Sequence, residues 1–488
     1  MHVLTCRAEP YGPARRWIFR QIEQKREDEP MQTKIRKARR LLALLVALAA
    51  LLSACQPTPA EEIIVNRGDG ALEEAIAATA VPAARYEAPQ RWEETFEVRG
   101  QTVRIDMPVE VADAGEYPVL TVQRRNIDAQ QCIAAAEALL GGPAQLREQE
   151  YGYDDILADL RFVQRGQVHW NDSTGEVQFL PYEGQQEEID RLKALLAEAA
   201  AREETYVPLD AGTLGDSLSF RYVRGADGRA GYLTWCGGHL LFQRCREGNV
   251  QLESWLLQNG GYIGEEPHAL EHVVITEEEA VAAGEALLAQ LGLDHLVLSS
   301  AERARMLDNK GDYPYEPLGE GYLLTYVSAP GGTIPYDYEP YSDFYLLEFL
   351  TEEANPQYAL GWQQERAAIF VTEDGVLSFA WDDPKEIVNT ANENAALLPF
   401  DQVQQHVRDL LHLALPVYDE EADPHGDVLL QHMALGAALL RTPNRTDEAF
   451  LAPAWVILLT TEMDQRVGAA PCALLINALD GSYINRWA

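Results

Sequence analysis

A short apolar segment near the N-terminus limits how much of this chain can belong to the folded protein. Residues 41–52 form a run of twelve consecutive apolar residues, preceded by five basic residues between positions 34 and 40. As a helix, such a run would span about 18 Å, whereas the apolar core of a bilayer is about 30 Å thick. A basic segment followed by a short apolar run is typical of a cleaved signal peptide and not of a membrane span.

The residues after this run indicate lipid attachment. Leu52-Ser53-Ala54-Cys55 resembles the lipobox of bacterial lipoproteins, in which the signal is cut before the cysteine and its thiol is diacylated. The two prolines of residues 56–59 favour an extended tether, and two or three acyl chains anchor a protein durably. We therefore expect residues 31–54 to be a lipoprotein signal peptide and Cys55 to hold the protein at the extracytoplasmic face of the bacterial cell membrane. The alternative is an ordinary secretory signal with an incidental cysteine.

Residues 1–30 lie in front of this complete signal. Met31 opens the signal peptide by itself, so we expect the first 30 residues to be a mis-assigned start or a disordered extension.

The charge of the chain excludes one class of partner. The whole sequence carries a net charge of −38 and its first 54 residues carry +6, which leaves −44 for the part after the predicted cleavage site. A body this acidic repels nucleic acids and anionic polymers, so we expect no nucleic-acid partner. A hydrophobic content of 47% with nine tryptophans indicates folded domains and not a disordered stalk.

Hydrophobic periodicity predicts an α+β fold in which antiparallel sheets are each covered by amphipathic helices. Capping-box patterns predict helices after Asp128 and Thr276, and apolar spacing predicts two more, over residues 187–203 and from Phe400 to before Pro416. Alternating apolar runs separated by Asp/Gly turns predict hairpins over residues 169–180 and 367–381. Further strands are expected over residues 454–462 and 472–486, the latter with a turn at Asp480-Gly481.

The same reading predicts two domains. Residues 55–90 are expected to form a tether with one short helix, residues 91–262 the first α+β domain, and residues 263–488 the second. The boundary is placed in a stretch rich in glycine, proline and acidic residues, 259–268.

Four cysteines follow Cys55: Cys132, Cys236, Cys245 and Cys472. We expect a disulfide between Cys236 and Cys245, because Gly237-Gly238 between them permits a tight turn; the alternative is that all four are buried thiols. The segment WCGGH, residues 235–239, also brings a cysteine and a histidine close in sequence. Neighbours in sequence seldom adopt the geometry of a nucleophile and its base, so we do not expect a catalytic pair there.

The segment HALEH, residues 268–272, matches a zinc-peptidase pattern. It follows Pro267 and leads into β-branched residues, so we expect an extended segment, in which the two histidines lie about 13 Å apart and cannot share one zinc ion. No phosphate-binding loop, dinucleotide-binding motif or serine-hydrolase elbow is present in the sequence. We therefore expect neither a metal site nor a cofactor.

Tyrosines are concentrated in one region. Residues 313–345 contain eight of the 21 tyrosines of the chain. Exposed tyrosines bind sugars and peptides through large, rigid rings, which makes this region the candidate binding surface. Its members are Tyr313, Tyr315, Tyr336, Tyr338 and Tyr341. The alternative is that these side chains pack across the strands of a hairpin.

Three segments together resemble an uncharacterised family of bacterial lipoproteins, a domain of unknown function typical of Gram-positive gut anaerobes. They are CQPTPAEEIIVNRGDGALEEAI after the lipobox, VTEDGVLSFAWDDPKEIVN with NENAALLPFDQV further on, and APAWVILLTTE with LLINALDGSYINR at the end. The last segment is also similar to the end of a PepSY-type unit, a small helix-plus-sheet module of secreted and envelope proteins. The resemblance implies no activity, substrate or catalytic residue.

Together these features predict a lipid-anchored envelope protein with a non-enzymatic binding or regulatory role toward an unknown envelope protein or peptide. The alternative is a cell-surface hydrolase with a site assembled from residues distant in sequence. A solute receptor of a transporter would need two parallel α/β lobes, which the antiparallel strand pattern does not favour.

Overall fold

The computed structural model describes most of the chain after residue 70. The described residues are 71–80, 86–112, 116–149, 152–171, 176–214, 221–245, 254–258, 270, 272–308, 316–331, 333–337, 363–415, 426–441, 445, 447–462, 465 and 471–484. All of them lie in the compact unit Pro59–Ala488. The predicted signal peptide and Cys55 lie outside the described residues.

The larger sheet has ten strands, and every pairing in it is antiparallel. Its order is β11-β12-β13-β14-β15-β10-β9-β8-β4-β7. The bounds are β4 Ala144–Arg147, β7 Tyr206–Pro208, β8 Arg221–Gly225, β9 Ala230–Cys236, β10 His239–Cys245, β11 Ser254–Gln258, β12 Leu296–Asp308, β13 Glu316–Ser328, β14 Arg366–Thr372 and β15 Gly375–Asp382.

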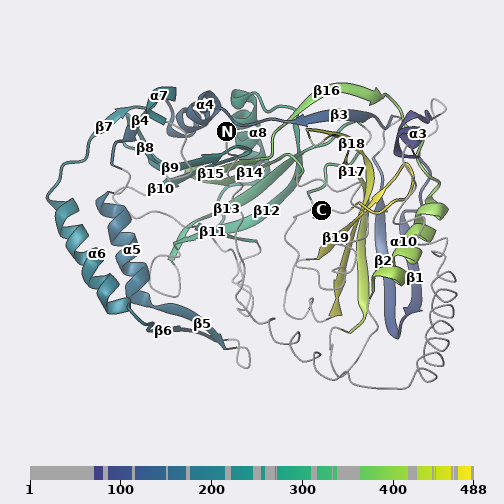
Figure 1. The fold of residues 1–488 in the computed structure, drawn as a ribbon, viewed down its shortest axis with the longest axis horizontal. Coiled ribbons are helices and arrows are strands. Elements are labelled where there is room, and N and C mark those ends of the chain that lie inside the picture. Colours follow the sequence, from purple (N-terminus) through teal and green to yellow (C-terminus); the bar gives the residue numbers. More distant parts are fainter. Residues whose placement is uncertain are drawn as a thin grey trace, which may run out of the picture. The chain divides into compact units, whose positions relative to one another are not determined.

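The smaller sheet has seven strands and takes them from both ends of the described chain (Figure 1). Its order is β1-β2-β17-β18-β3-β16, with β19 paired to β18. The pairing of β2 with β17 is parallel and the others are antiparallel. The bounds are β1 Arg91–Val98, β2 Gln101–Glu110, β3 Val119–Arg124, β16 Lys385–Asn392, β17 Val428–Arg441, β18 Glu448–Thr461 and β19 Cys472–Asn477.

The sheets confirm the predicted α+β class but not the predicted division of the chain. Strands from both sides of residue 262 build the ten-stranded sheet, since β10 pairs with β15. Strands β1, β2 and β3 pair within the sheet that also holds β16 to β19. The prediction of one domain over residues 91–262 and another over 263–488 is therefore wrong. The glycine- and proline-rich stretch marks a connection within one unit, because strand pairing and not local composition decides which segments fold together.

The helices with predicted caps form as expected. Helix α4, Ala129–Leu140, begins after a capping box of Asp128 with Gln131, and α8, Glu277–Leu291, begins after one of Thr276 with Glu279. Each ends at a glycine in the left-handed conformation, Gly141 and Gly292, which only glycine adopts without cost. The other helices are α3 Ala71–Ala77, α5 Tyr153–Arg165, α6 Gln185–Ala200, α7 Ala211–Leu214 and α10 Phe400–Ala414.

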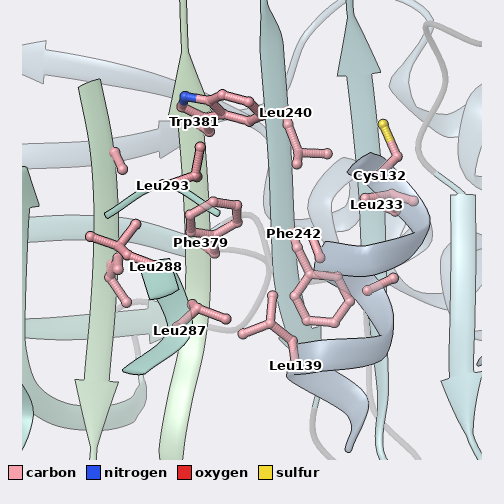
Figure 2. Close-up of a cluster of buried hydrophobic side chains, with 14 of the residues drawn as sticks. Cys132, Leu139, Leu233, Leu240, Phe242, Leu287, Leu288, Leu293, Phe379 and Trp381 are labelled. Carbon is pink, nitrogen blue, oxygen red and sulfur yellow. The ribbon is translucent and has the colours of Figure 1, made fainter. Parts of the chain in front are cut away.

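Two helices cover one face of the ten-stranded sheet. Figure 2 shows Cys132 and Leu139 of α4 and Leu287 of α8 packed over strands β9, β10 and β15. Phe242 and Phe379 from neighbouring strands lie between them and are fully buried. Helix α4 precedes strands β4 and β7 to β10 in the chain, and α8 precedes β12 to β15. All of these strands belong to the ten-stranded sheet, so both helices pack on it.

The seven-stranded sheet has a helix on each face. Val403, Val407, Leu410 and Leu411 of α10 are fully buried in the same cluster as Trp455 of β18, as their spacing predicts. The short helix α3 packs Leu72 and Ile76 into a separate cluster with Val456, the next residue along β18. Successive residues of a strand point to opposite faces, so β18 is buried on both sides.

Helices α5 and α6 and the two-stranded sheet of β5, Gln167–Asn171, and β6, Glu176–Leu180, extend from the ten-stranded sheet through the chain between β4 and β7 (Figure 1). The β5–β6 pairing confirms the hairpin predicted over residues 169–180.

One buried group, the Arg147 network, joins α5 to the sheet. It consists of Arg147 of β4, Asp155 of α5, Tyr232 of β9 and Glu204 after α6, with Arg147 ion-paired to both carboxylates. The Tyr232 hydroxyl donates to Asp155 Oδ1 at 2.6 Å, and Arg147 lies 4.6 Å from the centroid of the Tyr222 ring. The Arg147 and Asp155 side chains are 2% and 3% exposed, so this central pair is closed to solvent, whereas the Glu204 side chain is 33% exposed.

Candidate functional site

The chain passes between the two sheets twice, and the two passages lie side by side. Residues 124–127 lead from β3 to α4, and residues 382–385 lead from β15 to β16. The Arg125 N–H donates to the Pro384 carbonyl at 2.9 Å, and Arg124 pairs with Asp383 at 2.6 Å. These residues, here called the crossing segments, are therefore joined by both backbone and side-chain contacts.

The Gly237-Gly238 turn between β9 and β10 is held by both crossing segments. The Ile127 N–H donates to the Gly237 carbonyl at 2.7 Å, and the Asp383 N–H donates to the Gly238 carbonyl at 2.6 Å. Gly237 has a φ of +54°, in the left-handed region that favours glycine. A Cβ atom on Gly238 would lie 3.2 Å from Arg124 and Asp383 side-chain atoms. The turn is thus packed tightly and fixed from two sides.

Three chemically reactive side chains form a row across β9, β10 and β15. In the strand register, His239 lies directly opposite Cys236 on one side and Asp382 on the other. Directly opposed residues of antiparallel strands point to the same face, with Cβ atoms about 4.5–5.5 Å apart. Leu240 and Trp381, their neighbours along the strands, face the helix-covered core. The row of Cys236, His239 and Asp382 therefore lies on the opposite face of the sheet.

The row is open to solvent. Cys236 is exposed, and the side chains of His239 and Asp382 are 44% and 31% exposed. His239 Nδ1 forms a hydrogen bond with Asp382 Oδ1, and this bond is the main cause that raises the pKa of the histidine above its ordinary value. Because Asp382 holds Nδ1, the other ring nitrogen, Nε2, is left to face a further group.

A second histidine–carboxylate pair lies beneath the crossing segments. Glu365, whose side chain is 1% exposed, accepts a hydrogen bond from the Trp381 indole at 3.1 Å and pairs with His295 at 3.2 Å. The hydrogen bond to Glu365 raises the pKa of His295. Arg125 lies over the Trp381 ring, 5.5 Å from its centroid. Glu365 therefore anchors Trp381 and His295 in one polar cluster.

Lys385 begins β16 and is nearly buried. Its ammonium donates to the Asp383 carbonyl, and burial lowers its pKa from 10.5 to about 8. Asp383 itself has a φ of +46°, a conformation that few residues other than glycine adopt. The start of β16 is thus fixed by polar contacts.

The rest of β16 is exposed. Among the described strands, β16 forms one edge of the seven-stranded sheet and pairs only with β3, with register shifts after Ile387 and after Thr390. Residues 386–391 are all exposed, with Ile387 at 55% and Val388 at 46%. Ile387 and Val388 are adjacent, so β16 exposes a continuous apolar surface at this register shift.

The predicted disulfide between Cys236 and Cys245 is wrong. Cys236 is a free cysteine, and in the β9–β10 register Cys236 lies opposite His239 whereas Cys245 lies opposite Ala230, at the other end of the hairpin. Disulfide formation requires Cα atoms within about 7 Å, and the hairpin separates these two by most of a strand length. The Gly-Gly turn does form, but it brings Cys236 next to His239.

The tyrosine-rich surface is described at one of its five predicted members. Tyr336 is half-buried and stacks on His432 of β17, with ring centroids 5.4 Å apart, and burial raises its pKa to about 12. Tyr313, Tyr315, Tyr338 and Tyr341 lie outside the described residues. Tyr336 packs against the seven-stranded sheet, which fits the alternative of a packing role at this position.

Of the HALEH segment, His268 and Glu271 lie outside the described residues, and His272 is exposed ahead of α8. Its backbone N–H donates to Glu320 at 2.8 Å. Within the described part of the chain, no group of three or more histidine, cysteine, aspartate or glutamate side chains is arranged to hold a metal ion. The same part contains no helix of the length and apolarity that a membrane span requires.

From the sequence we do not expect Cys236 and His239 to act as a pair, whereas the structure places them directly opposite each other in the β9–β10 register. In a hairpin with a two-residue turn, the residues that flank the turn are cross-strand partners, and WCGGH contains such a turn. The third member, Asp382, lies 143 residues from His239, and no local pattern connects the two.

Comparisons with known proteins do not identify a family or an activity for this chain. No protein-family model and no curated protein matches the chain. Among solved structures, an uncharacterised protein from Eubacterium rectale ATCC 33656 is similar at 13% sequence identity, over 81% of this chain and 93% of its own, with a TM-score of 0.40.

Proposed function

We propose that this protein is a lipoprotein, anchored through acyl chains on Cys55 at the extracytoplasmic face of the cell membrane, that binds an extended segment of another envelope protein at the edge of β16. The observation that supports the binding role is the exposure of Ile387 and Val388, at 55% and 46%, on a strand that pairs on one side only within the described part of the chain.

Edge strands attract other chains because they present unpaired backbone donors and acceptors. Folded proteins ordinarily protect such edges with charges, prolines or covering segments. In β16 the exposed positions include Ile387 and Val388 next to asparagine and threonine, and only Glu386 is charged. An extended peptide that adds a strand here would form main-chain hydrogen bonds and cover the exposed apolar side chains of Ile387 and Val388.

The rigid start of β16 suits this role. Lys385 and the contacts between residues 124–127 and 382–385 fix the first residues of the strand. A preformed edge loses little conformational entropy when a peptide binds, which favours affinity.

Charge indicates which kind of segment would bind. The part of the chain after residue 54 has a net charge of −44, so association is fastest with a partner segment that carries lysine or arginine beside its apolar residues. The tether of residues 55–70 and the lipid would hold the edge near partners at the membrane surface.

The binding role is tested by crosslinking in the native cell. A photoreactive amino acid at Thr390 should capture a defined partner, and the double variant Ile387→Glu/Val388→Glu should lose at least about tenfold of that product, because buried charges oppose strand addition. The matched control is Val274→Glu/Val297→Glu, which places the same two charges at apolar residues that are 69% and 44% exposed outside β16. Equal capture by both variants would remove β16 as the binding edge.

The anchor is tested separately. Cys55→Ala should release the protein from the membrane fraction, and the set of neighbours found by proximity labelling should change with it. A Cys55→Ala protein that stays with the membrane and keeps the same neighbours would contradict lipid attachment, whatever the result at β16.

A further inference from the structure

We propose that Cys236, His239 and Asp382 form a nucleophilic thiol centre that accepts acyl groups from esters and thioesters and releases them to water. Cys236 is the nucleophile, His239 its base and Asp382 a positioning residue. This inference goes beyond the binding role, does not depend on it, and takes up the alternative of a cell-surface hydrolase whose site is assembled from distant residues.

The order of the three strands gives the argument. Strand β10 lies between β15 and β9, so His239 has the carboxylate of Asp382 on one side and the thiol of Cys236 on the other. The hydrogen bond at Nδ1 fixes the ring and places its proton on the Asp382 side, which leaves Nε2 free to take a proton. This is the arrangement in which a carboxylate orients a histidine toward a nucleophile.

Access to solvent distinguishes Cys236 from Cys132 and Cys472. Cys132 and Cys472 are buried, with 0% and 2% exposure, whereas Cys236 is exposed. Burial also raises the pKa of the Cys132 thiol to about 12, which makes that thiol inert. An exposed thiol in register with a histidine–aspartate pair can meet an acyl donor without any opening of the fold.

Two backbone donors lie beside the thiol. The N–H groups of Gly237 and Gly238 make no hydrogen bond to any other described residue, although the carbonyls of both glycines are bonded to the crossing segments. Backbone N–H groups next to a nucleophile stabilise the negative oxygen that develops during acyl transfer. The Gly237 carbonyl shares a planar peptide group with the Gly238 N–H, so its hydrogen bond to Ile127 also fixes the direction of that N–H.

The reaction balances with water as the only co-reactant. Cys236 Sγ bonds to the acyl carbon while His239 Nε2 takes the thiol proton; the bond to the leaving oxygen or sulfur then breaks, and the leaving group receives that proton. Water, deprotonated by His239, attacks the resulting thioester, the carbon–sulfur bond breaks, and the acid and the thiol are formed. Because Cys236 is exposed, the substrates are acyl groups carried on accessible chains.

The test uses the full chain with p-nitrophenyl acetate. The wild-type protein should release p-nitrophenolate in a burst and carry an acetyl group on the peptide that contains Cys236. His239→Ala should slow acetylation of Cys236 by about a hundredfold or more, the usual loss when a general base is removed. The control is His272→Ala, which removes another exposed histidine and should leave the rate unchanged.

The role of Asp382 needs a readout that a merely structural residue would not move. In Asp382→Asn, the midpoint of the pH profile of acetylation should shift to lower pH, because the bond to Asp382 raises the pKa of His239. An equal burst of p-nitrophenolate in Cys236→Ala and wild type, or equal rates of Cys236 acetylation in His239→Ala and wild type, would overturn the proposal. All these side chains are partly or fully exposed, and thermal unfolding of each variant verifies that the fold is intact.

Discussion

Two groups of ionisable side chains on the ten-stranded sheet differ in their access to solvent. In the Arg147 network, Arg147 and Asp155 are 2% and 3% exposed, and Tyr232 and the Gly152 N–H complete the partners of the carboxylate. In the row on β9, β10 and β15, the side chains of His239 and Asp382 are 44% and 31% exposed. Both contain a carboxylate paired to a base, but only the second can meet a substrate.

The difference separates structural from reactive pairs. A buried ion pair whose partners are all satisfied fixes the position of an element, here α5 against the sheet, and removing one partner leaves a charge without compensation. A half-exposed pair contributes little to stability because water screens it. Its geometry must then be maintained by other contacts, and the backbone hydrogen bonds of Gly237 and Gly238 provide them.

The strongest test of this comparison removes one carboxylate from each group. Asp155→Ala should lower the free energy of unfolding by about 3–5 kcal/mol, because Arg147 stays buried without its main partner. Asp382→Ala should lower it by less than about 1 kcal/mol. Urea unfolding with an unchanged m value measures both. Similar losses in the two variants would show that exposure does not separate the groups.

A smaller effect is expected at Glu365, which is buried and anchors Trp381 and His295. Glu365→Ala removes the acceptor of the buried Trp381 indole and should cost about 1–3 kcal/mol. Glu365→Gln keeps an acceptor oxygen of similar shape and is the matched control, with a smaller expected loss. If the alanine variant unfolds at the same urea concentration as wild type, burial is not what sets the energy of these polar contacts.

The elements that could be predicted from the sequence are those that depend on local contacts, and those that could not depend on long-range contacts. Helices α4, α8 and α10 and the hairpins of β5–β6 and β14–β15 have local signals, namely capping boxes, apolar spacing and Asp-Gly or similar turns. Helix α5 was not predicted because its N-cap residue, Gly152, has no side chain that could accept a capping hydrogen bond and so gives no N-cap signal in the sequence. The domain boundary failed because β2 pairs with β17 and β3 with β16, between segments hundreds of residues apart.

The candidate site follows the same rule. Cys236 and His239 flank a two-residue turn, so their proximity could have been predicted from the WCGGH segment. The remaining features depend on contacts between segments far apart in sequence. They are the pairing of Asp382 with His239, the hydrogen bonds from Ile127 and Asp383 to the turn, and the exposure of β16. The predicted Cys236–Cys245 bond failed for a related reason, since a tight turn brings together its flanking residues and not those nine positions apart.

The smallest effect expected is a pH dependence from the two histidine–carboxylate pairs. The folded-state pKa values of His239 and His295 are raised by hydrogen bonds to Asp382 and Glu365, above an ordinary value of 6.5. A raised pKa means that the folded state binds the proton more tightly than the unfolded state does. The stabilisation is therefore fully present below pH 6.5 and is lost as the pH rises through the raised values.

Wild-type protein should accordingly lose more stability between pH 6 and 8 than a His239→Gln/His295→Gln variant, by under about 1 kcal/mol because both side chains are two-fifths exposed and screened by water. Urea unfolding at each pH measures the difference. The single variants refine the comparison: His295 pairs with a buried carboxylate and His239 with a half-exposed one, so His295→Gln should remove the larger share of the pH dependence. A larger share at His239 would mean that the open row, and not the buried Glu365 cluster, carries the stronger ion pair.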